Sequence, residues 1–209
     1  IVNSGHLEKG FKPVHWCTDC GSALAEAEVE YQDKISPAID VKFLIDDSSV
    51  FAHAFGVDTA LLTKTSVVIW TTTPWTIPAN RAISIHPTLN YALVALDGQQ
   101  IVIAQDLVED CMARYGIDAA DYQVLATCQG QALENTLAAH PYLDIKVPLI
   151  LGEHVTTESG TGCVHTAPAH GVDDFNVGKQ YGIEVYNPVG ANGVYIEDTP
   201  LFAGQHVFK

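Results

Sequence analysis

Alternating hydrophobic and polar residues predict most of the strands of this chain. Residues 25–31 (AEAEVEY) repeat with a period of two, which is typical of a strand that exposes one acidic face. Apolar runs at 41–45 and 66–70 indicate two more strands, the second of them buried. Asp97-Gly98 joins two further apolar runs, and this pair tolerates the positive φ angles of a tight hairpin turn. The remaining strands are expected at 91–96, 99–104, 122–126 and 147–151, with a last hairpin around Asn192-Gly193.

Two segments carry the spacing of amphipathic helices. In residues 105–115 the apolar side chains fall on one stripe, and Gly116 follows as a C-terminal stop. The second helix is expected at 172–181 and ends at Gly182. Strands outnumber helices and do not alternate with them regularly. This pattern favours an α+β fold, with a barrel-like sheet flanked by a few helices, over a doubly wound fold.

The composition is typical of one globular domain. The chain has 209 residues, of which 47% are hydrophobic, and this length can bury a sizeable core without metals or disulfides. Its longest apolar stretches, such as 67–70, have the length of strands, so no membrane span is expected. The chain starts at Ile1, and its first residues do not show the charged and then apolar pattern expected of a leader peptide. We interpret it as a piece of a larger cytoplasmic protein.

The net charge limits the partners that this chain can bind. Its 10 Lys and Arg residues stand against 25 Asp and Glu residues, which gives a net charge of −15. A broad phosphate-binding face for duplex nucleic acid is therefore not expected. A short single-stranded end can still be held by stacking and a few hydrogen bonds.

The first segment that can carry chemistry is 70–80 (WTTTPWTIPAN). Thr71, Thr72 and Thr73 end a predicted strand, because Pro74 cannot continue the hydrogen-bond ladder. Their hydroxyls therefore lie at a strand end, open to a substrate. Threonines, an amide and two indoles offer hydrogen bonds and stacking faces without charge, which suits a ribose and a base. The alternative is that these threonines are ordinary strand residues.

The second such segment is 160–175 (GTGCVHTAPAHGVDDF). A glycine-rich turn enters a short strand, and a loop with a proline then leads into the second predicted helix. The first turn of that helix contains Asp173 and Asp174, where the helix dipole stabilises carboxylates. One of the two can simply cap the helix. We expect Asp174, His165 and His170 to converge on a pocket at this loop.

Three kinds of chemistry are open to these residues. Cys163, His165 and Asp174 can be a nucleophile, a base and the residue that orients the base. His165, His170 and Asp174 can instead form a metal site with two histidines and one carboxylate. In the third interpretation Asp174 pairs with a cation, His165 forms a polar wall and a water molecule attacks the substrate. The spacing of the residues does not separate these alternatives.

Cysteines and phosphate-binding motifs restrict the cofactors. Cys17 and Cys20 form a possible zinc half-site, but tetrahedral zinc needs four ligands and the chain has no second CxxC pair. We therefore expect no metal bound by this chain alone. The chain has five cysteines in total, and the odd number and irregular spacing indicate reduced thiols. It contains no glycine-rich phosphate loop, so nothing in it would activate ATP.

Taken together, segments 70–80 and 160–174 resemble the two signature motifs of the editing domain of bacterial-type isoleucyl-tRNA synthetases. These enzymes belong to the class I synthetases, in which the valyl, isoleucyl and leucyl members share such a domain. Residues 12–31 resemble the strap that leads into it. The resemblance implies a barrel-like β core inserted into a Rossmann catalytic domain. It also implies that 1–209 is a single editing domain, with the strap at about 1–36 and the editing core at about 37–209.

The resemblance also implies a function and a role for each site residue. The domain would hydrolyse valine from mischarged tRNA(Ile), with valyl-adenylate as a further candidate substrate. Thr71, Thr72 and Thr73 would hold the terminal adenosine and the hydrolytic water. His165 would line the side-chain pocket, and Asp174 would pair with the α-ammonium group. The other pocket positions of the first motif are Trp75, Thr76 and Asn80.

Partners and cofactors follow from the same resemblance. The chain would bind the 3′ end of tRNA(Ile) carrying valine and would contact the rest of the synthetase chain, as a monomer. Editing itself would need no cofactor, and ATP, Mg²⁺ and zinc are expected only in the full-length enzyme. Two alternatives are kept: an ester hydrolase that uses Cys163, His165 and Asp174, and a non-catalytic zinc-knuckle binding module.

Overall fold

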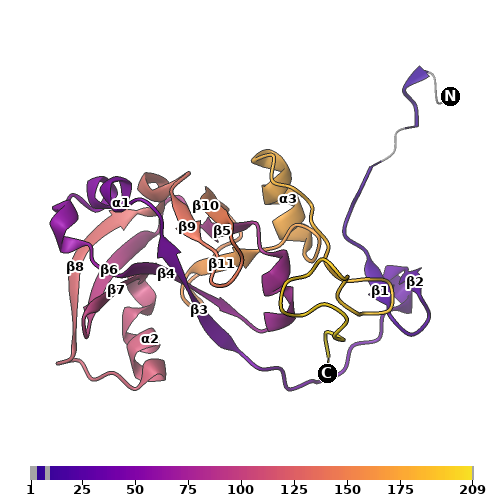
Figure 1. Ribbon diagram of the computed structural model, residues 1–209, viewed down its shortest axis with the longest axis horizontal. Helices are drawn as coiled ribbons and strands as arrows, with labels where there is room; N and C mark the ends of the chain where they lie inside the picture. Colours follow the sequence, from indigo (N-terminus) through magenta and orange to yellow (C-terminus); the bar gives the residue numbers. More distant parts are fainter. Residues whose placement is uncertain (1–3, 8–9, 209) are drawn as a thin grey trace.

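A ring of strands forms the body of the chain (Figure 1). The computed structural model describes residues 4–7 and 10–208. Neighbouring strands in the ring follow the order β11-β5-β10-β9-β3-β4, and the parallel pairing of Val164 in β11 with Trp70 in β4 closes it. The α+β, barrel-like fold expected from the sequence is therefore confirmed. The strands are β3 (Ile39–Ile45), β4 (Thr65–Thr71), β5 (Ala82–Ile85), β9 (Leu137–Ala139), β10 (Lys146–Leu151) and β11 (Cys163–Thr166).

The sheet continues beyond the ring from strand β4. Its extension is β7 (Gln99–Ala104), β6 (Asn90–Leu96) and β8 (Tyr122–Gln129), in that order. One edge of β4 pairs with β7 over its first half and with β11 near its end, at Trp70. The ring and the extension therefore separate along β4. The threonines that follow Trp70 therefore lie next to the position where β4 pairs with β11.

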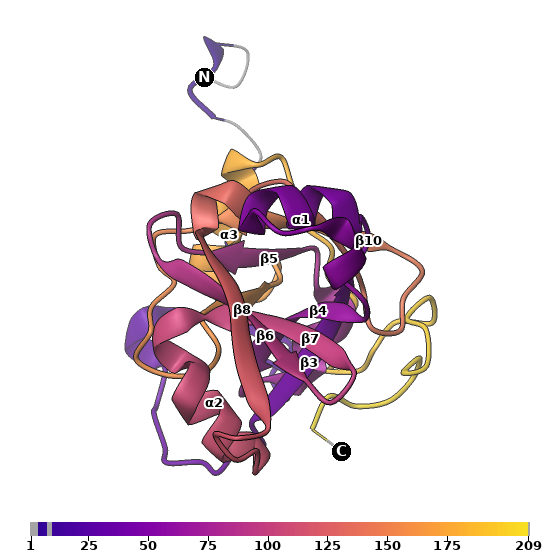
Figure 2. The same cartoon turned by 90° about the vertical axis from the view of Figure 1, so that its left-hand side faces the viewer.

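In the described part of the chain, three α-helices cover the sheet. Helices α1 (Ser48–Phe55) and α2 (Val108–Tyr115) lie on opposite sides of the extension formed by β6, β7 and β8 (Figure 2). Helix α3 (Val172–Gln180) packs on the ring through Val177, which contacts Ala82 of β5 and Ile150 of β10. This contact places the start of α3 beside the end of β11. Short 3-10 helices complete the fold: η2 (Glu26–Glu28), η3 (Thr59–Leu61), η4 (Pro74–Ala79), η5 (Gln105–Leu107) and η6 (Gly130–Leu133).

Most of the elements expected from the pattern are present. The hairpin around Asp97-Gly98 joins β6 and β7, and Gly98 has the positive φ of 70° that its turn requires. Both predicted helices form, the first of them as η5 followed by α2. The last hairpin is reduced to a turn, because only one isolated bridge joins Val189 and Tyr195 around Asn192.

The strand predicted at 25–31 is wrong. Residues 26–28 form the 3-10 helix η2, and the carboxylate of Glu28 accepts a 2.7 Å hydrogen bond from the backbone N–H of Ala25. Alternation indicates a strand only when one face is buried, and here neither face packs against the core. A separate small hairpin precedes this segment, formed by β1 (His15–Cys17) and β2 (Ser22–Leu24). The proposed division into a strap and a core at about residue 36 stays a prediction.

The core of the molecule is apolar and continuous. It extends from β3 through β4 to the β6–β7 hairpin and includes Phe43, Val67, Ile69, Leu93 and Ile103, which are almost completely buried. Burial of this kind supplies the main stabilisation of a domain of this size. Among the described residues, no helix has both the length and the apolar character needed to cross a membrane.

Candidate functional site

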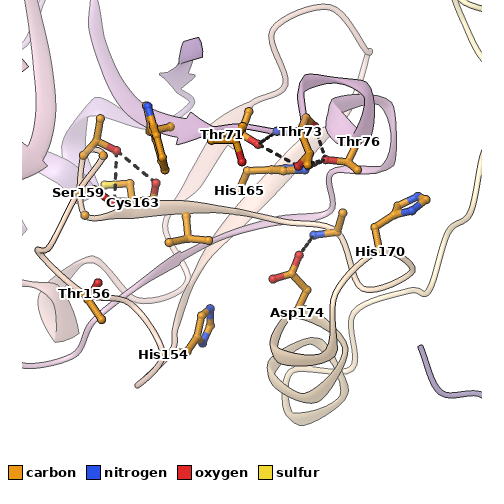
Figure 3. Close-up of a pocket in the computed structure, with 17 residues that line it drawn as sticks. Thr71, Thr73, Thr76, His154, Thr156, Ser159, Cys163, His165, His170 and Asp174 are labelled. Carbon is orange, nitrogen blue, oxygen red and sulfur yellow. Dashed lines mark hydrogen bonds between the residues drawn. The ribbon is translucent and has the colours of Figure 1, made fainter. Parts of the chain in front are cut away.

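A cavity of about 300 Å³ lies where β4 and β11 end beside the start of α3 (Figure 3). Its walls come from four parts of the chain: the end of β4 with the loop after it, the loop that precedes β11, β11 itself, and the loop into α3. Both sequence motifs therefore contribute to one cavity. The polar side chains that line it are Thr71, Thr72, Thr73, Thr76, His154, Thr156, Ser159, Thr161, Cys163, His165, His170 and Asp174.

The threonines form a hydroxyl cluster on one side of this cavity. The backbone N–H of Thr73 donates a 3.0 Å hydrogen bond to Oγ1 of Thr71, and the two hydroxyl oxygens are 3.2 Å apart. Thr71 is buried, whereas Thr72 and Thr73 are exposed. Pro74 begins η4 immediately afterwards, so the hydroxyls lie at a strand end as the sequence predicted. Such a cluster can hold a water molecule or a ribose without any charged group.

His165 is a fixed, neutral part of the cavity wall. Its Nε2 atom lies 2.8 Å from Oγ1 of Thr76, and its Nδ1 atom lies 2.6 Å from Nδ2 of Asn80. Burial, with smaller contributions from the nearby imidazoles of His170 and His140, lowers the pKa of His165 to about 3. The ring is therefore uncharged at neutral pH. Because both of its nitrogens have partners, it is held rigidly.

Asp174 brings a carboxylate to the same cavity. Its Oδ2 atom accepts a 2.8 Å hydrogen bond from the backbone N–H of Ala167, which anchors the side chain from α3 to the end of β11 (Figure 3). Within the described ranges, no side-chain nitrogen of Lys, Arg or His lies within 4.0 Å of its carboxylate oxygens. Burial raises the pKa of Asp174, and the hydrogen bond from the backbone N–H of Ala167 lowers it by a smaller amount. A carboxylate held without a cation is suited to receive one from a ligand.

Two further histidines line the cavity without forming a metal site. The buried Nε2 atoms of His154 and His170 have no hydrogen-bond partner in the part of the chain that is described. Burial also lowers the pKa of His170 to about 4, so this ring is neutral as well. His165, His170 and Asp174 do converge on one cavity. No group of three metal-ligating side chains occurs among the described residues, so these three do not form a coordination site.

The geometry argues against Cys163 as a nucleophile. Cys163 is only 2% exposed, and burial raises the pKa of its thiol well above the ordinary range, with the neighbouring Cys111 adding to the shift. His165 cannot act as its base, because both imidazole nitrogens are hydrogen-bonded to Thr76 and Asn80. Cys163 therefore fills space in the wall. Cys17 and Cys20 lie on the separate β1–β2 hairpin, far along the chain from this cavity.

Two predicted site residues lie outside the cavity. Asn80 is fully buried and stands behind His165. Trp75 lines a different cavity of about 750 Å³, and its indole meets the ring of His170 edge to face, with 5.3 Å between the ring centroids. His154 was not predicted, although the polar run around it, just before the glycine-rich turn, is a signal that would have pointed to it.

Comparison with known proteins connects these motifs to a family. Residues 1–186 match the family model described as tRNA synthetases class I (I, L, M and V). Over its whole length the chain is 64% identical to the isoleucine–tRNA ligase of Pseudoalteromonas atlantica and 61% identical to that of Colwellia psychrerythraea. The chain spans only 23% and 22% of those two proteins. These matches confirm the resemblance that the two motifs predict.

Solved structures show the same fold at low sequence identity. The chain superposes on the crystal structure of GlLeuRS-CP1 with a TM-score of 0.62 and 16% identity, covering 82% of this chain and 91% of that one. The cytosolic leucyl-tRNA synthetase editing domain of P. knowlesi gives a TM-score of 0.58 and 11% identity, with coverages of 74% and 68%. At these identities the likeness concerns the fold alone.

Proposed function

This chain belongs to the class I tRNA synthetases (I, L, M and V), and we propose that it is the editing domain of a longer isoleucine–tRNA ligase. In that role it hydrolyses valine from mischarged tRNA(Ile), and valyl-adenylate is a second candidate substrate. The observation that carries the proposal is the unpaired carboxylate of Asp174, held by Ala167 across one cavity from the threonine hydroxyls and His165. A positively charged amino group fits the side of Asp174, and an ester fits the side of the threonine hydroxyls.

Asp174 is proposed as the anchor for the substrate's α-ammonium group. A carboxylate and an ammonium group form a charge-assisted hydrogen bond, which is strong where water is partly excluded. The contact to Ala167 occupies only one carboxylate oxygen, so the other remains available to the substrate. This anchor fixes the position of the ester carbonyl relative to the hydroxyl cluster at Thr71 and Thr73.

His165 is proposed as the wall that selects against isoleucine. Isoleucine exceeds valine by one methylene, which is worth only about 1–3 kcal/mol in an apolar pocket, isoleucyl-tRNA synthetases being themselves a standard example of this magnitude. A second pocket that is too small for the extra methylene reverses the preference, because overpacking costs about 1–3 kcal/mol. A ring held at both nitrogens cannot move aside easily.

Hydrolysis in this site requires positioning more than a strong base. A water molecule held by the threonine hydroxyls adds to the ester carbonyl, and the bond between the carbonyl carbon and the ribose oxygen breaks. The proton of the water passes to that ribose oxygen, directly or through the neighbouring ribose hydroxyl. The products are free valine and uncharged tRNA. Fixing both reactants in this geometry supplies much of the rate.

The surroundings of the domain form part of the proposal. With a net charge of −15, the chain holds the single-stranded 3′ end, and the rest of the synthetase binds the tRNA body. We propose a monomeric, cytoplasmic enzyme. ATP, Mg²⁺ and zinc serve the full-length protein and take no part in editing.

Asp174 and its neighbour Asp173 provide a matched test in the full-length ligase. Asp174→Ala should abolish deacylation of valyl-tRNA(Ile), whereas Asp173→Ala should retain it, because Asp173 is exposed and lies outside the 300 Å³ cavity. A non-hydrolysable valyl-adenosine mimic should bind more tightly than its isoleucyl counterpart. Near-normal turnover by Asp174→Ala would refute the anchor. Equal binding of the two mimics would refute editing specificity.

A further inference from the structure

The amide of Asn80 is buried behind the cavity wall and contacts His165 directly. Asn80 is 0% exposed and does not line the cavity, so it cannot touch a substrate there. Its Nδ2 atom lies 2.6 Å from Nδ1 of His165 and 2.9 Å from the carbonyl oxygen of Ala82. One amide nitrogen therefore connects the imidazole to the first residue of β5.

The second contact fixes the orientation of the amide. The carbonyl oxygen of Ala82 accepts hydrogen bonds and cannot donate one, so the atom of Asn80 that faces it must be the NH2 group. Rotating the amide by 180° would place two oxygens against each other. The Oδ1 atom of Asn80 is left buried without a partner among the described residues. The two hydrogen bonds made by Nδ2 thus stabilise this orientation more than the missing hydrogen bond at Oδ1 destabilises it.

This orientation determines where His165 carries its proton. Because Nδ2 of Asn80 can only donate, Nδ1 of His165 must accept and must be unprotonated. The proton of the neutral ring is then on Nε2, which donates to Oγ1 of Thr76 at 2.8 Å. The hydroxyl of Thr76 in turn donates to the carbonyl oxygen of Thr73, also at 2.8 Å. Every group in this chain of hydrogen bonds has one role.

We infer that Asn80 is a positioning residue that sets the tautomer of His165 and, through it, the orientation of Thr76 and the Thr73 turn. Asn80 therefore acts on the site through His165 and not by contact with the substrate. It was expected from the sequence to contact the substrate, and its burial assigns it this different role. We also infer that the contact from Asn80 supports specificity by keeping the His165 ring rigid and uncharged, and this part rests on the proposed editing function.

Two consequences follow for the site. Protonation of Nδ1 would place its N–H against the NH2 group of Asn80, so Asn80 opposes a charged imidazole. Burial of the ring acts in the same direction, lowering the pKa of His165. The ring also cannot rotate by 180° without losing its contacts to both Asn80 and Thr76. A wall with these properties excludes by shape and does not take a proton from the hydrolytic water.

The tautomer can be measured without any substrate. In the 209-residue chain labelled with ¹⁵N-histidine, nitrogen chemical shifts distinguish a protonated from a bare ring nitrogen. The signals of His165 are identified among the nine histidines by their loss in His165→Gln. We expect wild-type His165 to have a bare Nδ1 and a protonated Nε2. In Asn80→Asp the carboxylate accepts, so the proton should move to Nδ1 or both nitrogens should be protonated.

Two further variants keep the test decisive if Asn80→Asp does not fold. Thr76→Val removes the acceptor of the Nε2–H group but leaves Asn80, and the wild-type tautomer should persist. Ser84→Ala is the matched control. It removes the buried 2.7 Å hydrogen bond between Ser84 of β5 and Thr166 of β11, and Ser84 makes no hydrogen bond to His165. It should leave the tautomer unchanged. Reversal in Thr76→Val, or an unchanged tautomer in a folded Asn80→Asp, would overturn the inference.

The consequence for specificity is measured separately in the full-length ligase. Asn80→Ala removes the contact that holds the His165 ring. The ratio of kcat/KM for isoleucyl-tRNA hydrolysis to kcat/KM for valyl-tRNA hydrolysis should then rise about tenfold, because kcat/KM for isoleucyl-tRNA increases. Ser84→Ala should leave the ratio unchanged. An altered tautomer with an unchanged ratio would refute the role in specificity. Failure of the wild-type enzyme to hydrolyse valyl-tRNA would instead refute the proposed function, and the tautomer result would stand.

Discussion

Asp174 at the start of α3 is tied to Ala167 just beyond β11 by a 2.8 Å hydrogen bond between the Ala167 N–H and Oδ2 of Asp174. This contact holds the carboxylate of Asp174 at the cavity. The N-cap of α3 is Gly171, and no side chain in the described part of the chain caps its first turn. The position of Asp174 therefore depends on the packing of α3 against the ring, which brings these two residues together.

The pH dependence of editing should reflect this carboxylate. Burial raises the pKa of Asp174 above the ordinary value for aspartate. The charged form, which is the form proposed to bind the ammonium group, is present above that pKa and is lost as the pH falls through it. Plots of kcat/KM for valyl-tRNA deacylation against pH should therefore show an acid limb at a higher pH than an ordinary aspartate would give. Asp173→Asn should keep this limb, and an acid limb at or below the ordinary pKa of aspartate would contradict the assignment.

Replacing His165 should separate a sieve from a base. In His165→Ala the wall is removed while Asp174 and the threonines stay, so isoleucyl-tRNA should begin to be deacylated and valyl-tRNA should still be hydrolysed. Loss of a general base would depress both reactions by about 10²–10⁴-fold with no gain for isoleucine. Deacylation of both charged tRNAs by the same full-length variant is the measurement. Loss on both substrates would mean that His165 is catalytic.

Replacing Cys163 tests the alternative of a covalent mechanism. The thiol is buried, its pKa is raised and it has no base, so Cys163→Ala should keep valyl-tRNA hydrolysis within a few-fold of wild type. The small cavity left by the sulfur should lower the free energy of unfolding by about 1 kcal/mol. Rapid quenching followed by mass spectrometry checks for an acyl-enzyme. Valine trapped on Cys163 would overturn the hydrolytic mechanism.

Metal analysis tests the cysteine pair near the start of the chain. Cys17 and Cys20 supply two ligands where tetrahedral zinc needs four, and the described residues contain no third. The 209-residue chain should therefore hold much less than one zinc per molecule when it is purified without chelator. A full equivalent of zinc that disappears in Cys17→Ser would show that further ligands exist within the chain.

Local sequence determined the parts of this protein that depend on near neighbours. The hairpin at Asp97-Gly98 follows from a turn that needs positive φ, and α2 ends where Gly116 adopts φ of 70°. The second motif also predicted that Asp174, His165 and His170 converge, and all three line one cavity, whereas Trp75 and Asn80 of the first motif do not line it. Helix α1 carries comparable local signals in its Asp47 cap and in Gly56, but the pattern of apolar residues did not reveal it.

Only the tertiary structure decided which surroundings each side chain faces. The alternation at 25–31 predicted a strand, but among the described residues no strand pairs with this segment and neither of its faces is buried, so residues 26–28 form η2 instead. Trp75 and Thr76 are adjacent in sequence, yet they line different cavities, because η4 turns their side chains apart. Asn80 lies behind His165 because β5 and β11 pair. Such placements depend on contacts between residues distant in sequence, and spacing along one segment cannot encode them.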